Sequence, residues 1–184
     1  MAGSVAGAEE RPWSRAYRFE VYPVVQMLSG AETSFVYGEF ELEADATPVF
    51  GAGLGLNLND HLNINTEFLL GRMSTEGNFP LASGAHMDLG LTVGLWSLNL
   101  DYNLFKSRLT PLVTGGLGFI MFDNGDENVN ETDFSYNVGV GGRWDMSDHI
   151  ALRVIYRSTW TTLQRADDSL RFDGVLANLS FMFK

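Results

Sequence analysis

Ionisable side chains that alternate with apolar ones are the residues of this sequence best suited to chemistry. One face of the alternating segments carries eight of them: Arg18, Glu20, Glu67, Asp88, Asp101, Arg143, Arg153 and Arg157. A charge that leaves water persists only when it is paired, so we expect these carboxylates and guanidinium groups to form ion pairs. We predict that Arg153 or Arg157 pairs with Glu67, Glu20 or Asp101. A gated path for ions is the alternative use of this face.

A second group, Ser83, His86 and Asp88, contains the residue types of a hydrolytic triad. Such a triad would cleave an ester, but these three residue types often fall close together by chance. His61 and His149 each follow an aspartate in a segment with the composition of a turn, and we interpret both as turn residues. Glu67 is expected to be an ionised structural partner of arginine. We therefore predict no catalytic residue and no enzymatic activity, with a lipid hydrolase as the remaining alternative.

Two further segments resemble ligand sites only superficially. The segment DNGDENVNETD holds five acidic side chains, and its composition predicts an exposed loop: Asp123, Asp126, Glu127, Glu131 and Asp133. It lacks the ligand spacing and the terminal glutamate of an EF-hand. The GAGLG segment would suggest a phosphate loop only if a helix followed it, and a strand pattern follows instead. The chain has no cysteine, so disulfides and thiolate metal sites are excluded. No metal or cofactor is predicted.

The elements that must position these residues are strands. Apolar residues recur at every second position, which is the period of a strand whose two faces differ chemically. The alternating segments are 17–28, 50–58, 62–70, 87–104, 113–121, 136–144, 150–160 and 175–183. The phase of the alternation changes near Trp96, which predicts either a bulge in one long strand or a break into two. We predict about eight strands, with residues 1–14 as an N-terminal segment and residues 15–184 as one domain.

Composition decides which face of these strands meets solvent. The chain has 184 residues, of which 45% are hydrophobic and 19% charged, yet it has no apolar run long enough for a membrane-spanning helix. One strand face is apolar, and the other mixes ionic residues with many of the 20 glycines. A narrow barrel interior needs such small residues beside large ones. We therefore predict an antiparallel up-and-down β-barrel with an apolar outer surface and a packed polar interior, the arrangement of a transmembrane barrel. The net charge of −11 argues against a nucleic-acid partner.

Two hairpins repeat each other within this pattern. In GAGLGLNLNDHLNI and VGGRWDMSDHIALR, Gly53 and Gly141 precede Asp60 and Asp148 by the same interval. A histidine and then an aliphatic residue follow each aspartate. We predict that the two hairpins occupy equivalent positions in a repeated meander. The start of the chain lacks the pattern of a signal peptide, and we interpret it as a mature N-terminus.

The whole pattern resembles the small outer-membrane barrels typified by the OmpA transmembrane domain, OmpX and OmpW. Three passages carry the resemblance: SRLTPLVTGGLGF, SYNVGVGGRWDMSDHIALRVIYR and the terminal ANLSFMF. The terminal strand resembles the signal that the barrel assembly machinery binds, whose alternate residues here are Val175, Ala177, Leu179, Phe181 and Phe183. Lys184 after Phe183 departs from the usual ending.

The resemblance implies a monomer in the bacterial outer membrane, with short turns in the periplasm and longer acidic loops outside. Lipids and lipopolysaccharide are the implied partners, the latter through divalent cations held by the acidic loops. The resemblance implies a structural or adhesive role, in which the loops contact a surface ligand. Passage of small or apolar solutes, as in OmpW-like barrels, is the alternative.

Overall fold

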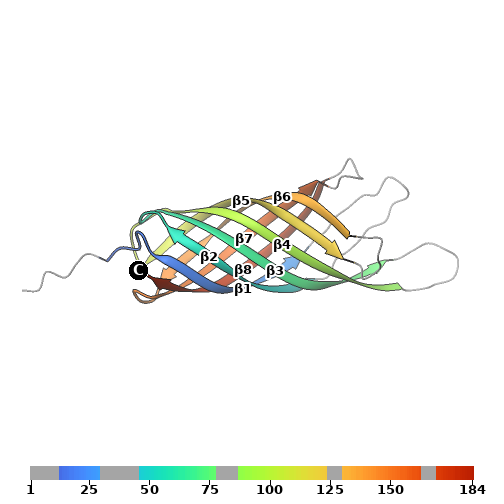
Figure 1. The fold of residues 1–184 in the computed structure, drawn as a ribbon, viewed down its shortest axis with the longest axis horizontal. Coiled ribbons are helices and arrows are strands. Elements are labelled where there is room, and N and C mark those ends of the chain that lie inside the picture. The colour runs from blue at the N-terminus through green and yellow to red at the C-terminus, as the bar shows by residue number, and fades with distance from the viewer. Residues whose placement is uncertain (1–12, 30–45, 78–86, 124–129, 163–168) are drawn as a thin grey trace, which may run out of the picture.

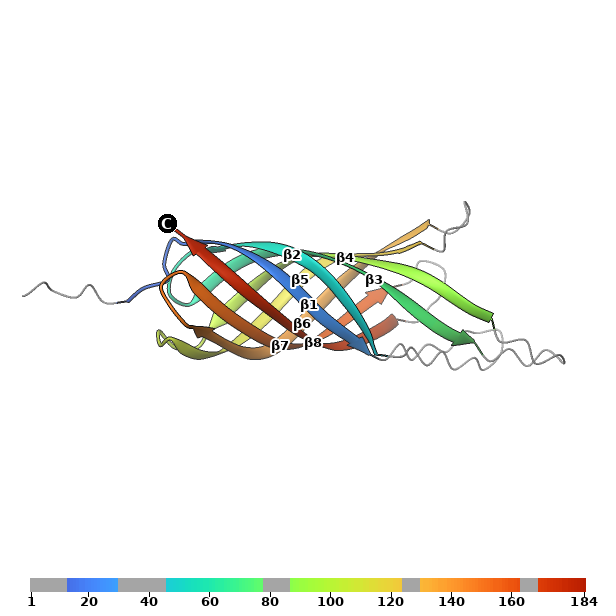
Figure 2. The same ribbon diagram turned by 90° about the horizontal axis from the view of Figure 1, so that it is seen from below.

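The computed structural model describes residues 13–29, 46–77, 87–123, 130–162 and 169–184 of the chain. Its eight strands are β1 (Phe19–Ser29), β2 (Thr47–Asn57), β3 (Leu62–Gly77), β4 (Met87–Asn103), β5 (Leu109–Asp123), β6 (Asn130–Asp145), β7 (Ile150–Thr162) and β8 (Ser169–Phe183). Each strand pairs antiparallel with the next, and β8 pairs with β1 to close the barrel (Figures 1 and 2). The predicted eight-stranded up-and-down barrel is confirmed. No helix in the described part of the chain is long and apolar enough to cross a membrane.

The two ends of the barrel differ in their connections. Turns 58–61, 104–108 and 146–149 lie at one end together with the C-terminus, and we call this the turn end (Figure 1). The segment just before β1 also lies there. We call the opposite end, where β1 ends and β2 begins, the loop end.

The outer wall is apolar and the interior contains most of the polar side chains. On β4 the side chains of Trp96, Leu98 and Leu100 face outward, whereas Ser97 and Asn99 between them are buried inside. The same alternation is found on the other strands. This is the reverse of a water-soluble barrel and is the distribution that a lipid surface requires.

The strand around Trp96 is continuous, so the predicted bulge or break is wrong. The register between β3 and β4 runs from Leu62 opposite Tyr102 to Gly77 opposite Met87 without interruption. The alternation in sequence changes because Val93 and Leu95 are apolar but point into the barrel. What changes along β4 is the chemistry of the interior.

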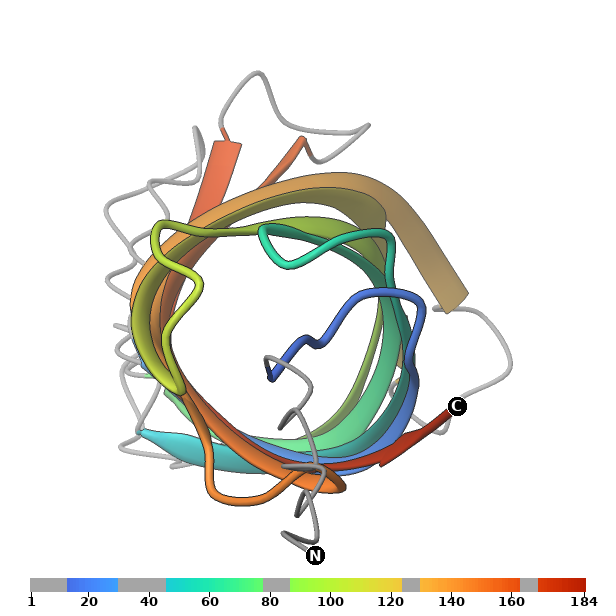
Figure 3. The same cartoon turned by 90° about the vertical axis from the view of Figure 1, so that its left-hand side faces the viewer.

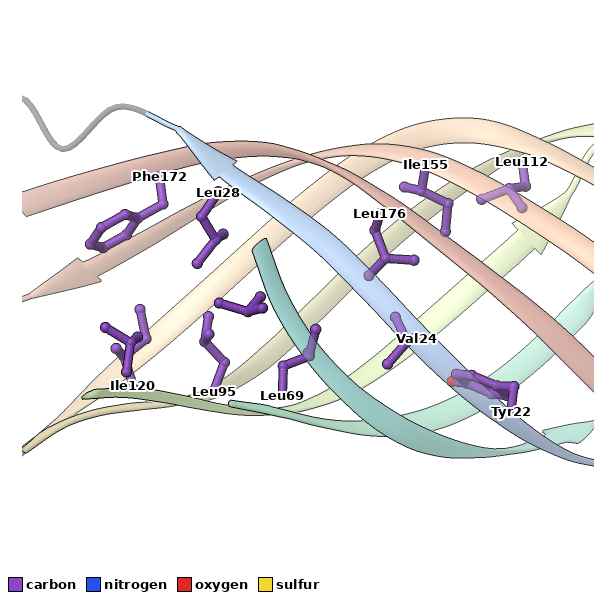
Figure 4. Close-up of a cluster of buried hydrophobic side chains, with 12 residues drawn as sticks. Tyr22, Val24, Leu28, Leu69, Leu95, Leu112, Ile120, Ile155, Phe172 and Leu176 are labelled. Atoms are coloured by element: carbon purple, nitrogen blue, oxygen red, sulfur yellow. The ribbon is translucent and has the colours of Figure 1, made fainter. Parts of the chain in front are cut away.

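The interior is therefore only partly polar, which corrects the prediction of a polar interior throughout. A cluster of apolar side chains fills much of it (Figure 4). On β3 and β4, Leu69 and Leu95 follow the polar Glu67 and Ser97 in the direction of the loop end. Leu28, Ile120 and Phe172 join them from β1, β5 and β8. The loop-end part of β6 and β7 stays polar, with buried Ser135 and Thr159.

The two hairpins that repeat in sequence have matching turns. In the first turn, Asn59 Oδ1 accepts hydrogen bonds from the backbone N–H groups of His61 and Leu62, at 2.7 and 2.9 Å. In the second, Ser147 Oγ accepts from the N–H groups of His149 and Ile150, at 3.2 and 3.1 Å. The two turns lie between β2 and β3 and between β6 and β7, on opposite sides of the ring.

Candidate functional site

Eight of the buried charged side chains of the interior form an ionic plug, which we define as Arg15, Glu20, Glu67, Asp101, Arg143, Asp145, Arg153 and Arg157. Arg143 lies at its turn-end part. Its Nη2 donates to Glu20 Oε1 at 2.6 Å, and its Nε donates to Asp145 Oδ1 at 2.9 Å. Glu20 also accepts a 2.6 Å hydrogen bond from the amide of Asn57. All three charged side chains are almost completely buried.

Arg153 and Arg157 extend the plug toward the middle of the barrel. Arg153 Nη1 donates to Asp101 Oδ2 at 2.6 Å, and its Nη2 lies 3.9 Å from Glu20 Oε2. Arg157 Nη1 donates to Glu67 Oε2 at 2.7 Å. Tyr22 connects the Arg153 and Arg157 ion pairs. The Arg153 guanidinium lies 4.5 Å from the centroid of the Tyr22 ring, and the Tyr22 hydroxyl donates to Glu67 Oε1 at 3.2 Å.

These ion pairs cross the barrel instead of following its wall. Arg157 on β7 and Glu67 on β3 come from opposite strands of the ring of eight. The pairs of β6 with β1 and of β7 with β4 join strands three positions apart. The four arginines of the plug balance its four carboxylates in charge, and pairing of this kind lets charged groups remain buried. An interior cavity lined by Gln26, Asn137 and Arg157 measures about 10 Å³, which is room for about one water molecule.

Residues 13–18, the N-terminal strap, close the plug at the turn end. In the end-on view of Figure 3, the segment before β1 crosses the mouth of the ring. Arg15 donates to Asp145 Oδ2 at 2.9 Å and to the carbonyls of Asp60 and Ser107 at 2.9 and 2.7 Å. Burial lowers the pKa of Arg15, and the charge of Asp145 opposes that shift. The guanidinium also lies 4.8 Å from the centroid of the Trp13 ring.

The structure brings six of the eight predicted network residues together: Glu20, Glu67, Asp101, Arg143, Arg153 and Arg157. Arg18 was wrongly placed in the network. It lies in the strap before β1 begins, and its guanidinium donates to the backbone carbonyl of Asp148 at the rim. Asp88 is part of β4, but its side chain lies outside the described residues.

The acidic loop is shorter than predicted. Asp123 ends β5, while Glu131 and Asp133 belong to β6, because the β5–β6 hairpin continues to the pair Asp123 and Asn130. Asp133 is 3% exposed and points inward, so it is no part of an exposed loop. Asp126 and Glu127 lie outside the described residues.

The other predicted residues lie at the ends of the barrel, on β8 or outside the described part of the chain. Ser83 and His86 lie outside the described residues. His61 and His149 lie in turns, and His61 Nδ1 is 2.8 Å from the carbonyl of Asn103. The alternate residues of the predicted assembly signal lie on the outward face of β8: Val175, Ala177, Leu179, Phe181 and Phe183.

Two members of the plug were missed from the sequence. Asp145 lies two positions after Arg143, so strand alternation places both on the inner face. This two-residue spacing is visible in the sequence, but the turn-like residues that follow Asp145 made it resemble a part of the turn. Arg15 precedes the first strand and has no periodicity that indicates its position.

Comparisons with known proteins agree with this architecture. The family model described as outer membrane protein beta-barrel domain matches residues 8–183. Among solved structures, Neisserial surface protein A matches with a TM-score of 0.64 at 11% identity. The match covers 90% of this chain and 97% of that protein's chain. OprG from Pseudomonas aeruginosa has a TM-score of 0.60 at 12% identity, covering 92% and 97%.

The attachment invasion locus protein Ail of Yersinia pestis, in complex with the heparin analogue sucrose octasulfate, has a TM-score of 0.51 at 10% identity, covering 91% and 99%. At these identities the likeness concerns the fold alone. No curated protein matches the sequence. The family match covers the whole closed barrel, so this chain belongs to the outer membrane protein beta-barrel domain family and is a protein of the bacterial outer membrane.

Proposed function

We propose that this protein is a closed barrel that acts through the surface it presents, as a structural or adhesive component of the outer membrane. The observation that carries the proposal is the set of ion pairs that cross the interior, above all Arg157 with Glu67 between opposite strands. A solute would have to displace these paired charges, and breaking one buried pair costs about 3–5 kcal/mol.

A structural role also agrees with the closure of the barrel. Every strand has two paired neighbours, so the wall offers no long free edge for pairing with another chain. We propose that the protein works as a monomer in lipid. Its likeness to Ail concerns fold only, and this chain's charge of −11 makes a heparin-like polyanion an unsuitable ligand.

Conductance measurements test closure directly. In planar bilayers, the purified protein should give no current steps above those of bilayers without protein. Steady current steps from the wild-type barrel would contradict the proposal. Variants in which Glu20, Arg143 and Arg153 are all replaced by serine should conduct if the plug is what closes the barrel.

A cellular experiment tests the role itself. Deletion of the gene should increase sensitivity to detergents or reduce attachment to surfaces, and the wild-type gene should restore both. The variant Glu67→Met/Arg157→Met replaces a crossing pair with apolar side chains and should restore them equally well. A loss of complementation by this folded variant would favour a function that uses the interior.

Passage of small apolar molecules is the second candidate, because Leu28, Leu95 and Phe172 give the loop-end interior an apolar lining. Such molecules would enter from the loop end and leave through the wall before the plug. Uptake of a fluorescent apolar probe by proteoliposomes tests this candidate, with Leu95→Asp as the variant that should block it. Uptake at the rate of liposomes without protein would remove this candidate.

A further inference from the structure

A pocket of about 490 Å³ opens at the turn end, next to the strap and to turns 58–61 and 104–108. Its lining includes Tyr17, Asp60, His61, Tyr102 and Lys106. None of these five residues belongs to the ionic plug. Asp60 contacts the plug through hydrogen bonds from Arg15, but ligand binding in this pocket does not depend on the function proposed above.

The pocket combines a positive and a negative group at a spacing suited to a zwitterion. Lys106 Nζ lies 3.7 Å from Asp60 Oδ2, and the lysine is 66% exposed. The other carboxylate oxygen of Asp60 accepts from the Ser14 hydroxyl at 2.6 Å and from the Arg15 N–H at 3.0 Å. Oδ2 is thus the oxygen that faces a cation, while the lysine supplies a donor for an anion.

His61 adds a second acceptor. Its Nδ1 lies 2.8 Å from the backbone carbonyl of Asn103 and must carry the proton, because a carbonyl only accepts. In the neutral ring, Nε2 is then the acceptor. The ring stacks on Tyr102 with centroids 5.7 Å apart. Carboxylate, imidazole and tyrosine rings together suit an ammonium group that can donate several hydrogen bonds.

The wall next to the pocket suits acyl chains. Leu62 pairs with Tyr102 at the pocket, and the next outward pair on the same strands is Ile64 with Leu100, both apolar and exposed. Tyrosine rings at the boundary of an apolar band mark the depth of the lipid head groups. A ligand with a zwitterionic head and apolar tails would fit head and tails at once.

We propose that this pocket binds the head group of a phosphoethanolamine phospholipid. The ammonium group donates to Asp60 Oδ2 and His61 Nε2, the phosphate accepts from Lys106, and the acyl chains lie along Ile64 and Leu100. A head group that carries only negative charge would be repelled by the Asp60 carboxylate. A choline head group has no N–H to donate.

The experiment uses the full chain folded in dodecyl maltoside, observed by nuclear magnetic resonance. Dihexanoyl phosphatidylethanolamine is titrated while the amide signals of residues 60–62 and 102–106 are followed. The shifts should saturate, and the phosphatidylcholine and phosphatidylglycerol analogues should need about tenfold more lipid, the effect of one charge-assisted hydrogen bond. Equal half-saturation for the three lipids would overturn the proposal.

Matched variants separate this pocket from general lipid contact. Lys106→Ala should raise the half-saturating concentration about tenfold, by the loss of one charge-assisted hydrogen bond. Arg108→Ala should leave it unchanged, because Arg108 belongs to another exposed ion pair at the same end, with Asp148 at 3.2 Å. Equal effects of the two variants, or equal shifts in the matching turn 146–149, would show nonspecific contact and refute the site.

Gel migration before and after boiling shows whether Lys106→Ala folds. If it does not fold, a second variant still tests the proposal. His61→Phe keeps a ring to stack on Tyr102 but removes the Nε2 acceptor. It should weaken phosphatidylethanolamine binding while leaving phosphatidylcholine unchanged. An unchanged preference in this variant would also contradict the proposal.

Discussion

Arg157 and Glu67 form the most direct test of the plug at the scale of single residues. Their side chains are 4% and 1% exposed. Replacing Arg157 with Met leaves the carboxylate buried, with Tyr22 and Asn99 as its remaining hydrogen-bond donors within the described residues. We expect the free energy of unfolding to fall by about 3–5 kcal/mol, measured by urea titration in detergent.

The double variant Glu67→Met/Arg157→Met should recover much of that loss, because no uncompensated charge remains inside. Arg108→Ala is the matched control, since its pair with Asp148 is half exposed and such pairs contribute about 0–1 kcal/mol. Similar losses for the single and double variants would show that the stabilisation comes from packing.

Because of Asp60, docking of the strap at the turn end should depend on pH. Burial alone would raise the pKa of this carboxyl, but hydrogen bonds from Ser14 and Arg15 and the charge of Lys106 outweigh it and lower the pKa. A carboxyl with a lowered pKa in the folded state stabilises that state above its unfolded pKa, and the contribution disappears as pH falls through the folded value. The strap should therefore stay docked at neutral pH and loosen below about pH 4, where an ordinary aspartate titrates.

Hydrogen exchange of the Arg15 amide measures this loosening. In Asp60→Asn the exchange should be faster at neutral pH and lose its acid transition. The matching variant Asp148→Asn in the second turn should behave like the wild type. An acid transition that persists in Asp60→Asn would assign it to another carboxyl.

At the scale of the strand, Gly53 on β2 makes room for Tyr22 on β1. A Cβ built at Gly53 would lie 2.4 Å from the Tyr22 ring, far below a normal contact. We expect Gly53→Ala to displace the ring from Glu67 and Arg153 and to lower the free energy of unfolding by about 1–3 kcal/mol.

Gly142→Ala is the control on a strand, because its Cβ would lie 4.0 Å from the nearest atom, the carbonyl oxygen of Thr110. Thermal unfolding in detergent compares the two variants. Equal midpoints would mean that Tyr22 moves aside at little cost.

The strands themselves were predictable because alternation is a local property of the chain. The eight segments and the outward apolar face both follow from it. The error near Trp96 had a physical cause. Alternation shows where the chemical character changes, but Val93 and Leu95 are apolar on the inner face, so the pattern imitated a change of register.

At the scale of the whole molecule, the apolar outer wall predicts that the stability lost on placing a charge there depends on the depth of the residue in the membrane. Leu98 lies on β4 and is 50% exposed, whereas Leu109 begins β5 at the turn end and is 69% exposed. We expect Leu98→Arg to lower folding stability in lipid vesicles by about 2–4 kcal/mol and Leu109→Arg by about 0–1 kcal/mol.

Folding yields in vesicles, read from gel migration without boiling, check this difference. A larger loss for Leu109→Arg would place the lipid band elsewhere on the barrel. Equal small losses would argue that the wall tolerates charge and is not embedded at this depth.

The sequence by itself determined the class of fold, the eight strands and the outward apolar face, because each depends on neighbours within a strand. It also indicated six of the charged residues that meet inside. The sequence also predicted that Arg153 or Arg157 pairs with Glu67, Glu20 or Asp101, but tertiary structure decided which arginine pairs with which carboxylate. Tertiary structure alone placed Arg15 inside the plug and Arg18 outside it. It also decided that apolar side chains fill the loop-end interior. These features depend on which strands face each other across a closed ring, and ring closure brings together residues far apart in the chain, such as Arg15 and Asp145, which are 130 positions apart.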